Sequence, residues 1–243
     1  MEILVIGSGA REHVLVTALK LDETVGRIIC APGNAGIARD VQTREVDATS
    51  AQAIGDLAAE LRVDLVVIGP EVPLVAGAAD AVRAHGIACF GPSAAAAQLE
   101  GSKGFAKLVM DEAGVDTARA RVCEALDEVA AALDEFGAPH VVKDDGLAAG
   151  KGVVVTSDRD EAFAHARVCL DRGGDARVVI EEYLDGPEVS LFGITDGTTI
   201  IPLEPAQDFK RAFDGDAGPN TGGMGAYSPL PWAPPDLVAD VTE

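Results

Sequence analysis

The sequence KDDGLAAGKG, which begins at Lys143, combines two lysines with closely spaced glycines. Glycine lets a backbone approach a ligand, and Lys151 with nearby backbone N–H groups can donate to phosphate oxygens. The sequence is not a P-loop, because Gly146 and Gly150 are too close together and Gly152 replaces the Ser or Thr of that motif. The β-like run VVVT follows. We therefore predict a glycine hairpin between two strands that can cover a triphosphate; a flexible hairpin without a ligand is the alternative.

Charged residues close the two apolar runs on either side of this hairpin. Lys143 ends the run HVVK, and a half-buried lysine needs a negative partner such as phosphate. Glu181 and Glu182 close a second run, followed by Leu184 and Glu188. Carboxylate and main-chain groups there can read an adenine amino group, and Glu188 can reach ribose hydroxyls. Taken alone, each acidic residue is more often a solvated surface charge, but their order after the hairpin favours a nucleotide site.

A second glycine loop lies near the start of the chain. Gly7 and Gly9 follow an apolar run and precede an expected helix, whose N-terminus offers free N–H groups to a phosphate. Arg11 is the nearby cation. Glu12 occupies the position of the third glycine of the dinucleotide fingerprint, which argues against NAD or FAD. The alternatives are a tight turn without a ligand and an exposed arginine on the helix.

Four apolar runs, at 2–6, 27–31, 64–68 and 87–90, alternate with helix-like segments in the first hundred residues. This alternation predicts an open, parallel, Rossmann-like α/β sheet, whose ligands lie outside the carboxyl ends of the strands. Gly69 and Glu71 follow the third run, so we expect them to line the same crevice as Gly9; a simple strand-ending turn is the alternative. One expected helix covers 74–85.

The pattern changes near residue 101. Helices are expected at 102–113, 124–136 and 236–242, and short strands at 140–143, 152–156, 178–182, 188–194 and 199–203. Residues 205–235 are rich in Gly and Pro, and a loop of that length is usually functional or disordered. We therefore predict two domains, 1–101 and 102–243, the second an α+β domain.

The formal net charge of −21 argues against nucleic-acid binding, because no basic surface is available to displace counter-ions. The four cysteines are widely spaced and form no CxxC pair, which argues against a metal or redox motif and fits a reduced, cytoplasmic setting. The sequence shows no signal peptide and no apolar run long enough to span a membrane.

The order of these motifs resembles the ATP-grasp superfamily and, within it, the glycinamide ribonucleotide synthetases (phosphoribosylamine–glycine ligases). The matching sequences cover nearly the whole chain: VIGSGAREH (5–13), APGNAG (31–36), GPEVPLVAG (69–77), FGPS (90–93), QLEGSKGFAK (98–107), KDDGLAAGKGVVV (143–155), EEYLDGPEVS (181–190), QDFKR (207–211) and GPNTGGMGAYSP (218–229).

The resemblance implies ligation of glycine to 5-phosphoribosylamine through glycyl phosphate, with ATP and Mg2+ or Mn2+. It assigns Lys103 and Lys143 to the ATP phosphates, residues 146–152 to the loop over them, Glu181 with the 182–184 backbone to adenine, and Glu188 to ribose. It places the phosphosugar among Gly7, Gly9, Arg11, Gly69, Glu71 and the stretch 207–225.

Within that stretch the resemblance makes Asp208, Lys210 and Arg211 candidate catalytic contacts, to which it adds Lys151 from the glycine hairpin. Asn220, Gly222, Gly223 and Met224 form a backbone cradle.

The sequence departs from the family in three respects. Asp144 replaces a common alanine and Phe209 a common histidine. The carboxylate-rich EFN…RFGDPE-like sequence, which supplies the metal ligands, is absent, so we expect those ligands beyond residue 243 and an incomplete second domain. We therefore expect a monomer that is inactive or nearly so by itself. Another ATP-grasp ligase, a non-catalytic ATP-binding fragment and, less well supported, a Rossmann oxidoreductase are the alternatives.

Overall fold

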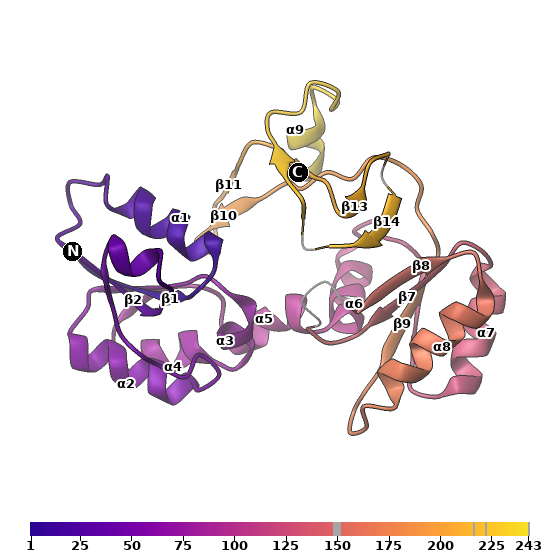
Figure 1. The fold of residues 1–243 in the computed structure, drawn as a ribbon, viewed down its shortest axis with the longest axis horizontal. Helices are drawn as coiled ribbons and strands as arrows, with labels where there is room; N and C mark the ends of the chain where they lie inside the picture. The colour runs from indigo at the N-terminus through magenta and orange to yellow at the C-terminus, as the bar shows by residue number, and fades with distance from the viewer. Residues whose placement is uncertain (148–151, 216, 222, 243) are drawn as a thin grey trace. The chain divides into compact units, whose positions relative to one another are not determined.

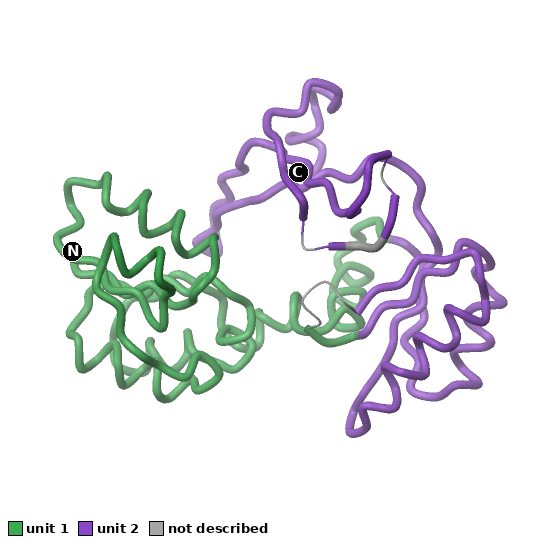
Figure 2. The backbone as a smooth tube through the Cα atoms, viewed as in Figure 1, with its two compact units in different colours: residues 1–117, 145–147 green, residues 118–144, 148–243 purple. Residues whose placement is uncertain are grey.

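The computed structural model describes residues 1–147, 152–215, 217–221 and 223–242, which form two compact units (Figure 2). Unit 1 contains residues 1–117 and 145–147, and unit 2 contains residues 118–144 with the chain after residue 147. Residue 101 lies inside unit 1, at the end of a helix that precedes a second helix of the same unit. The domain boundary at 101 stays a prediction.

Unit 1 is built on a five-stranded parallel sheet, which confirms the predicted N-terminal α/β fold. The strand order is β3-β2-β1-β4-β5. Because the order reverses direction at β1, the loops after β1 and β4 diverge from neighbouring strands at one sheet edge, where α/β sheets bind ligands. The strands are β1 (Glu2–Gly7), β2 (Arg27–Pro32), β3 (Gln42–Thr43), β4 (Leu65–Ile68) and β5 (Ala88–Phe90).

Both faces of this sheet are apolar and covered by helices. On β1, Leu4 and Ile6 pack on one side with residues of α2 and α4, while Ile3 and Val5 pack on the other side with Val16 of α1. Figure 1 shows α1 on one face of the sheet and α2 with α4 on the opposite face. Burial on both faces explains why the strands are continuous apolar runs.

The helices of unit 1 differ from the expectation at one place. The segment 74–85 is not one helix, because Gly77 adopts a φ of 90° and separates α3 from α4. A positive φ is easily adopted by glycine and cannot continue a right-handed helix. The helices are α1 (Ala10–Leu19), η1 (Ile37–Arg39), α2 (Ala51–Leu61), α3 (Glu71–Val75), α4 (Ala78–Ala84), α5 (Ala94–Gly101) and α6 (Lys103–Ala113).

Unit 2 contains a four-stranded antiparallel sheet of order β6-β9-β7-β8, which is the partial ATP-grasp-like α+β pattern predicted. Val142, Val178 and Ile180 face α7 and α8 in one hydrophobic cluster. Because side chains alternate along a strand, Lys143 and Glu181 lie on the opposite face. The elements are β6 (Ala120–Cys123), α7 (Leu126–Phe136), β7 (His140–Asp144), β8 (Val153–Thr156), α8 (Arg159–Leu170) and β9 (Val178–Glu181).

The rest of unit 2 consists of short strand pairs and one helix. The strand expected over 188–194 is wrong for most of its length: only a single bridge, Ser190 to Ala206, precedes β10. The Gly- and Pro-rich stretch 205–235 forms β-pairs where the pattern gave a loop. The elements are β10 (Gly193–Thr195), β11 (Ile200–Pro202), β12 (Gln207–Asp208), β13 (Arg211–Phe213), β14 (Ala217–Asn220), β15 (Ala226–Tyr227) and α9 (Leu237–Thr242). Within the described ranges, no helix is both long and apolar enough to cross a membrane.

Candidate functional site

A cavity of about 400 Å³ opens in unit 1 beside the loops that follow β1 and β4. Gly7, Gly9, Arg11 and Glu71 line it. Gly69 does not, but its carbonyl oxygen accepts a 2.7 Å hydrogen bond from Nη1 of Arg11. The structure therefore brings together, at one sheet edge, the five residues of this unit that were predicted to hold the phosphosugar, as parallel strand ends require.

Among the described residues, Arg11 is the only one that brings a guanidinium to this cavity, and it is already in contact with protein groups. Its Nη1 lies 3.6 Å from Oε2 of Glu71. The Arg11 side chain is 65% exposed, so this ion pair contributes little to stability and the guanidinium stays accessible to an anion.

Glu12 is a residue of this site that the sequence analysis did not select. It occupies the first turn of α1 and is 3% exposed. Its Oε2 accepts a 2.6 Å hydrogen bond from the backbone N–H of Gly9. The N–H that was expected to meet a phosphate is thus occupied by a carboxylate. The signal was the spacing itself, because a glutamate three residues after the helix cap is the second half of a capping box.

Lys103 and Gly146 meet in a second part of unit 1. The Nζ of Lys103, the first residue of α6, donates to the carbonyl oxygen of Gly146 at 3.0 Å. Next to them, Asp145 is 5% exposed and its carboxylate accepts from the Ser102 hydroxyl and from the Gly104 N–H at 2.7 Å. Asp145 therefore caps α6 and fixes the start of the glycine-rich segment. The sequence analysis missed it, because no spacing distinguishes it from the neighbouring Asp144.

The exposed face of the unit 2 sheet carries an ion pair between Lys143 and Glu181. Nζ of Lys143 lies 2.6 Å from Oε2 of Glu181, whose side chain is 7% exposed against 29% for the lysine. In the register of β7 and β9, Lys143 opposes Val179 and Glu181 opposes Val141, so the two side chains are diagonal neighbours. The negative partner that the half-buried lysine requires is therefore present within the sheet. Both residues line a cavity of about 550 Å³.

The segment after β9 forms one wall of this cavity. Glu182, Tyr183, Leu184 and Glu188 line it. The carboxylate of Glu182 accepts from the backbone N–H and the Nε of Arg119, at 2.9 and 2.8 Å. This anchor fixes the strand exit, while Leu184 is 65% exposed and presents an apolar surface.

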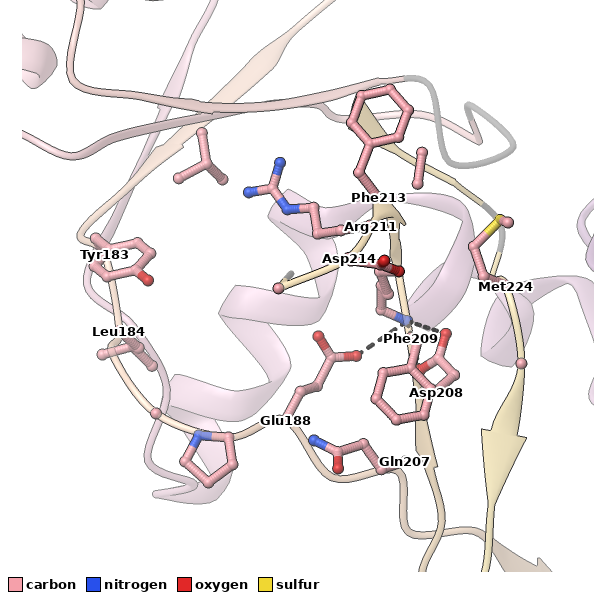
Figure 3. A pocket seen from close by; sticks show the side chains of 17 residues that line it. Tyr183, Leu184, Glu188, Gln207, Asp208, Phe209, Arg211, Phe213, Asp214 and Met224 are labelled. Carbon is pink, nitrogen blue, oxygen red and sulfur yellow. Dashed lines mark hydrogen bonds and ion pairs between the residues drawn. The ribbon is translucent and has the colours of Figure 1, made fainter. Parts of the chain in front are cut away.

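A second cavity of unit 2, of about 900 Å³, is lined by Asp208, Lys210, Arg211 and Met224 (Figure 3). Glu188 lines both this cavity and the 550 Å³ cavity. Nζ of Lys210 lies 3.0 Å from Oε1 of Glu188 and 2.9 Å from Oδ2 of Asp208. Figure 3 shows the two carboxylates directed toward this shared cation, with the contacts drawn as dashed lines. Desolvation opposes the charge on Lys210, but the hydrogen bonds to Asp208 and Glu188 prevail and raise its pKa above the usual value.

The remaining predicted residues are distributed around β13, β14 and β15. Arg211 donates from Nη1 to the carbonyl oxygen of Gly218 at 2.8 Å, which supports the β13–β14 pair. The backbone N–H of Gly223 donates to Oγ1 of Thr221, and that of Met224 to the carbonyl oxygen of Phe209. Asn220 opposes Arg211 in the strand register. Gly150, Lys151 and Gly222 lie outside the described residues, as do the central positions of the predicted hairpin.

Among the residues that the structure describes, no three His, Cys, Asp or Glu side chains are grouped so that they could hold a metal ion. Gly152 closes the end of the hairpin, because its carbonyl oxygen accepts from the backbone N–H of Asp144 at 2.7 Å. Asp144 also pairs through its carboxylate with Arg172.

Comparison with known proteins places both units in one class. Residues 101–243 match the model of the phosphoribosylglycinamide synthetase ATP-grasp (A) domain, and residues 1–100 match that of the phosphoribosylglycinamide synthetase N domain. The match to the A-domain model shows that the chain is an ATP-grasp protein, in which a parallel α/β unit precedes an antiparallel sheet.

More specifically, the chain belongs to the phosphoribosylglycinamide synthetase family. It is 63% identical over its full length to a phosphoribosylamine–glycine ligase of Streptomyces coelicolor and 59% identical to one of Leifsonia xyli. It spans 57% and 58% of those proteins, so it covers little more than half their length. A crystal structure of the phosphoribosylamine–glycine ligase of Thermotoga maritima matches all of this chain and 59% of its own, with 31% identity and a TM-score of 0.82.

Proposed function

We propose that this chain serves the ATP-dependent ligation of glycine to 5-phosphoribosylamine, which yields glycinamide ribonucleotide, ADP and phosphate in purine biosynthesis. The observation that carries the proposal is the match of both family models along residues 1–243, with relatives near 60% identity that are named for this ligation. The four cysteines are free thiols, which supports a reducing, cytoplasmic setting.

In this proposal the nucleotide binds on the exposed face of the unit 2 sheet. Lys143 holds phosphate oxygens, the 182–184 segment lies along the adenine, and Glu188 reaches the ribose. The cavity volume of about 550 Å³ suits such a ligand, because small-molecule sites measure roughly 300–1,000 Å³.

The chemistry needs positioning and charge rather than a protein nucleophile. An oxygen of the glycine carboxylate attacks the γ-phosphorus of ATP, the bond from that phosphorus to the β–γ bridging oxygen breaks, and ADP leaves. The amine nitrogen of 5-phosphoribosylamine then attacks the carbonyl carbon of glycyl phosphate, phosphate leaves, and the nitrogen loses a proton. Lys210 and Arg211 are the cations that we assign to the reacting groups, with Asp208 holding Lys210 in place. The unit 1 cavity, at Gly7, Gly9, Arg11 and Glu71, takes the phosphosugar.

ATP-grasp ligases use ATP with Mg2+, which neutralises charge on the transferred phosphoryl group. Among the described residues, no three His, Cys, Asp or Glu side chains are grouped around a site for this ion.

Nucleotide affinity tests the proposed phosphate contact directly. The chain is titrated with a fluorescent ATP analogue, and Lys143→Met is expected to weaken binding about tenfold or more, because an ion-paired phosphate contact is lost. Lys107→Met is the matched control: Lys107 lies on α6 and donates to Thr117, outside the unit 2 cavities. Equal affinities of the two variants would reject the nucleotide site.

The substrate assignment is tested by ADP release with ATP, Mg2+ and both small substrates. We expect little or no release by the 243-residue chain. When the chain is joined to the part of the Streptomyces coelicolor relative that it does not span, we expect release that requires glycine and 5-phosphoribosylamine together. Release that proceeds with another carboxylic acid and another amine would instead indicate a different ATP-grasp ligase. Tight nucleotide binding with no ADP release under any condition would favour a non-catalytic nucleotide-binding role for the chain.

A further inference from the structure

Glu12 holds a buried carboxylate under the glycine loop of unit 1. It is 3% exposed, and three glycines surround it. A Cβ atom on Gly7 would lie 2.5 Å from Cγ of Glu12, one on Gly9 3.0 Å from Oε2, and one on Gly69 2.0 Å from Oε1. These glycines therefore make room for the glutamate, in addition to any ligand.

Only one oxygen of this carboxylate has a donor. Oε2 accepts the Gly9 N–H. Oε1 lies against Gly69 and has no hydrogen-bond donor among the residues that the structure describes. Glu12 also lines the 400 Å³ cavity. Oε1 is not among the fully buried side-chain atoms that lack a partner, so it reaches the cavity, where a donor from a ligand can approach it.

Two other acidic residues of the chain show that this arrangement is unusual. Glu128 has the same position in α7, where its Oε2 accepts from the N–H groups of Glu124 and Ala125. Asp145 is equally buried and accepts from the Ser102 hydroxyl and the Gly104 N–H. Glu12 is buried, as Asp145 is, but it also lines a cavity. Among the described residues, only one of its two carboxylate oxygens has a donor, so the other can accept a hydrogen bond from a ligand.

The charges around the cavity indicate the class of ligand. Arg11 supplies one positive charge, while Glu12 and Glu71 supply two negative charges. A purely anionic ligand such as inorganic phosphate would meet a net repulsive wall. A ligand with a phosphate at one end and hydroxyl or amine donors at the other satisfies both kinds of group.

The geometry points to Glu12 as a direct substrate contact: its Oε1 accepts a hydrogen bond from a hydroxyl or nitrogen donor on the sugar of the phosphosugar substrate. This inference rests on the proposed function, because it deepens the assignment of the unit 1 cavity. The same carboxylate holds the Gly9 N–H, so one residue fixes both the loop and the sugar above it.

Glu12→Gln tests the contact by replacing the acceptor oxygen Oε1 with a hydrogen-bond donor. The carbonyl oxygen of the glutamine must still face the Gly9 N–H, which leaves its NH2, a donor, where Oε1 had been an acceptor. By calorimetry on the 243-residue chain, we expect the affinity for glycinamide ribonucleotide to fall about tenfold or more. The affinity for inorganic phosphate is expected not to fall, because the variant removes a negative charge. Glu128→Gln, the same change at the equivalent position of α7, should alter neither affinity.

A measurement on the unaltered chain covers the case in which Glu12→Gln fails to fold. With ¹³C-labelled glutamate, the Glu12 carboxyl resonance should move when glycinamide ribonucleotide is added and stay in place with inorganic phosphate. A folded Glu12→Gln variant with unchanged affinity, or a carboxyl resonance that does not respond to a bound phosphosugar, overturns the inference and leaves the proposed function standing. Failure of the wild-type chain to bind the phosphosugar overturns both.

Discussion

The ion pair between Lys143 and Glu181 should be an unusually strong stabilising contact for a chain with this many exposed charges. The two atoms are 2.6 Å apart, and the carboxylate is 7% exposed. We predict that Glu181→Gln destabilises the β7–β9 region and that the loss depends on the lysine being present.

The magnitude follows from the exposure of the two partners. Breaking a fully buried pair by removing one partner costs about 3–5 kcal/mol, because an uncompensated charge remains. The side chain of Lys143 is 29% exposed, so water recovers part of that loss. We therefore expect a coupling energy of about 1–3 kcal/mol between the two residues, against about 0–1 kcal/mol for a surface pair.

The assay is a double-mutant cycle of Glu181→Gln and Lys143→Met, read by urea-dependent hydrogen exchange of the β7 and β9 amides. Exchange is preferable to one unfolding curve, because two units do not guarantee a single transition. A second cycle on Arg44 and Glu60 is the control: they form a 2.8 Å pair whose side chains are 36% and 63% exposed. Equal coupling in the two cycles would refute the reasoning.

Three further predictions concern the packing and titration of other residues. Gly69→Ala should destabilise unit 1 by about 2 kcal/mol or more, since the new methyl group would overlap Glu12; thermal unfolding measures it. Asp145→Ala should cost about 1–3 kcal/mol, because it leaves the Gly104 N–H of α6 without its acceptor and the Ser102 hydroxyl without its partner; hydrogen exchange of the first α6 amides measures it. Burial raises the pKa of Cys30 and Cys123 from 9.0 to about 11. Protonated thiols are thus favoured by folding, so stability present below pH 9 should be lost as pH rises toward 11, by about 2–3 kcal/mol for each thiol.

Matched variants separate these causes from general damage. Gly86→Ala introduces a methyl group that meets nothing within 4 Å, so only its φ of 73° is strained and about 1 kcal/mol is expected. Ser50→Ala removes the cap of α2 and should cost about 1 kcal/mol without affecting α6. The double variant with alanine for both cysteines should show a flatter stability curve above pH 9. An unchanged slope there would contradict the titration argument.

Sequence patterns predicted the strands of unit 1 well, because burial on both faces leaves each as an apolar run between loops. The same patterns missed β3 and α8. β3 has only two residues, Gln42 and Thr43, too few to show a period. The apolar face of α8 is made of Ala162, Ala166 and Cys169, small residues that give a weak signal although they are buried.

The site was predictable wherever a side chain follows an apolar strand. Lys143 and Glu181 both satisfy this rule, and the sheet brings them together. The pairing itself could not be predicted, because it depends on the register of β7 against β9, which places Lys143 opposite Val179. The same holds for Lys210, whose partner Glu188 begins the segment 188–194, where the expected strand forms only at its end, in β10.

Both lysines that we assign to anionic groups in unit 2 are thus held by carboxylates before any ligand binds. In a chain with a net charge of −21, these ion pairs hold each ammonium group at its cavity wall, where it does not pair with other carboxylates of the surface. A phosphate that approaches Lys143 or Lys210 must share the cation with a carboxylate, so part of the attraction is offset by repulsion between anions.

The proposed function therefore requires further positive charge near the phosphates. Arg211 can supply some of it, because its side chain lines the larger cavity and only Nη1 is used by the Gly218 carbonyl oxygen among the contacts of the described residues. The lysines then set the position of the ligand, and the added charge decides how tightly it binds.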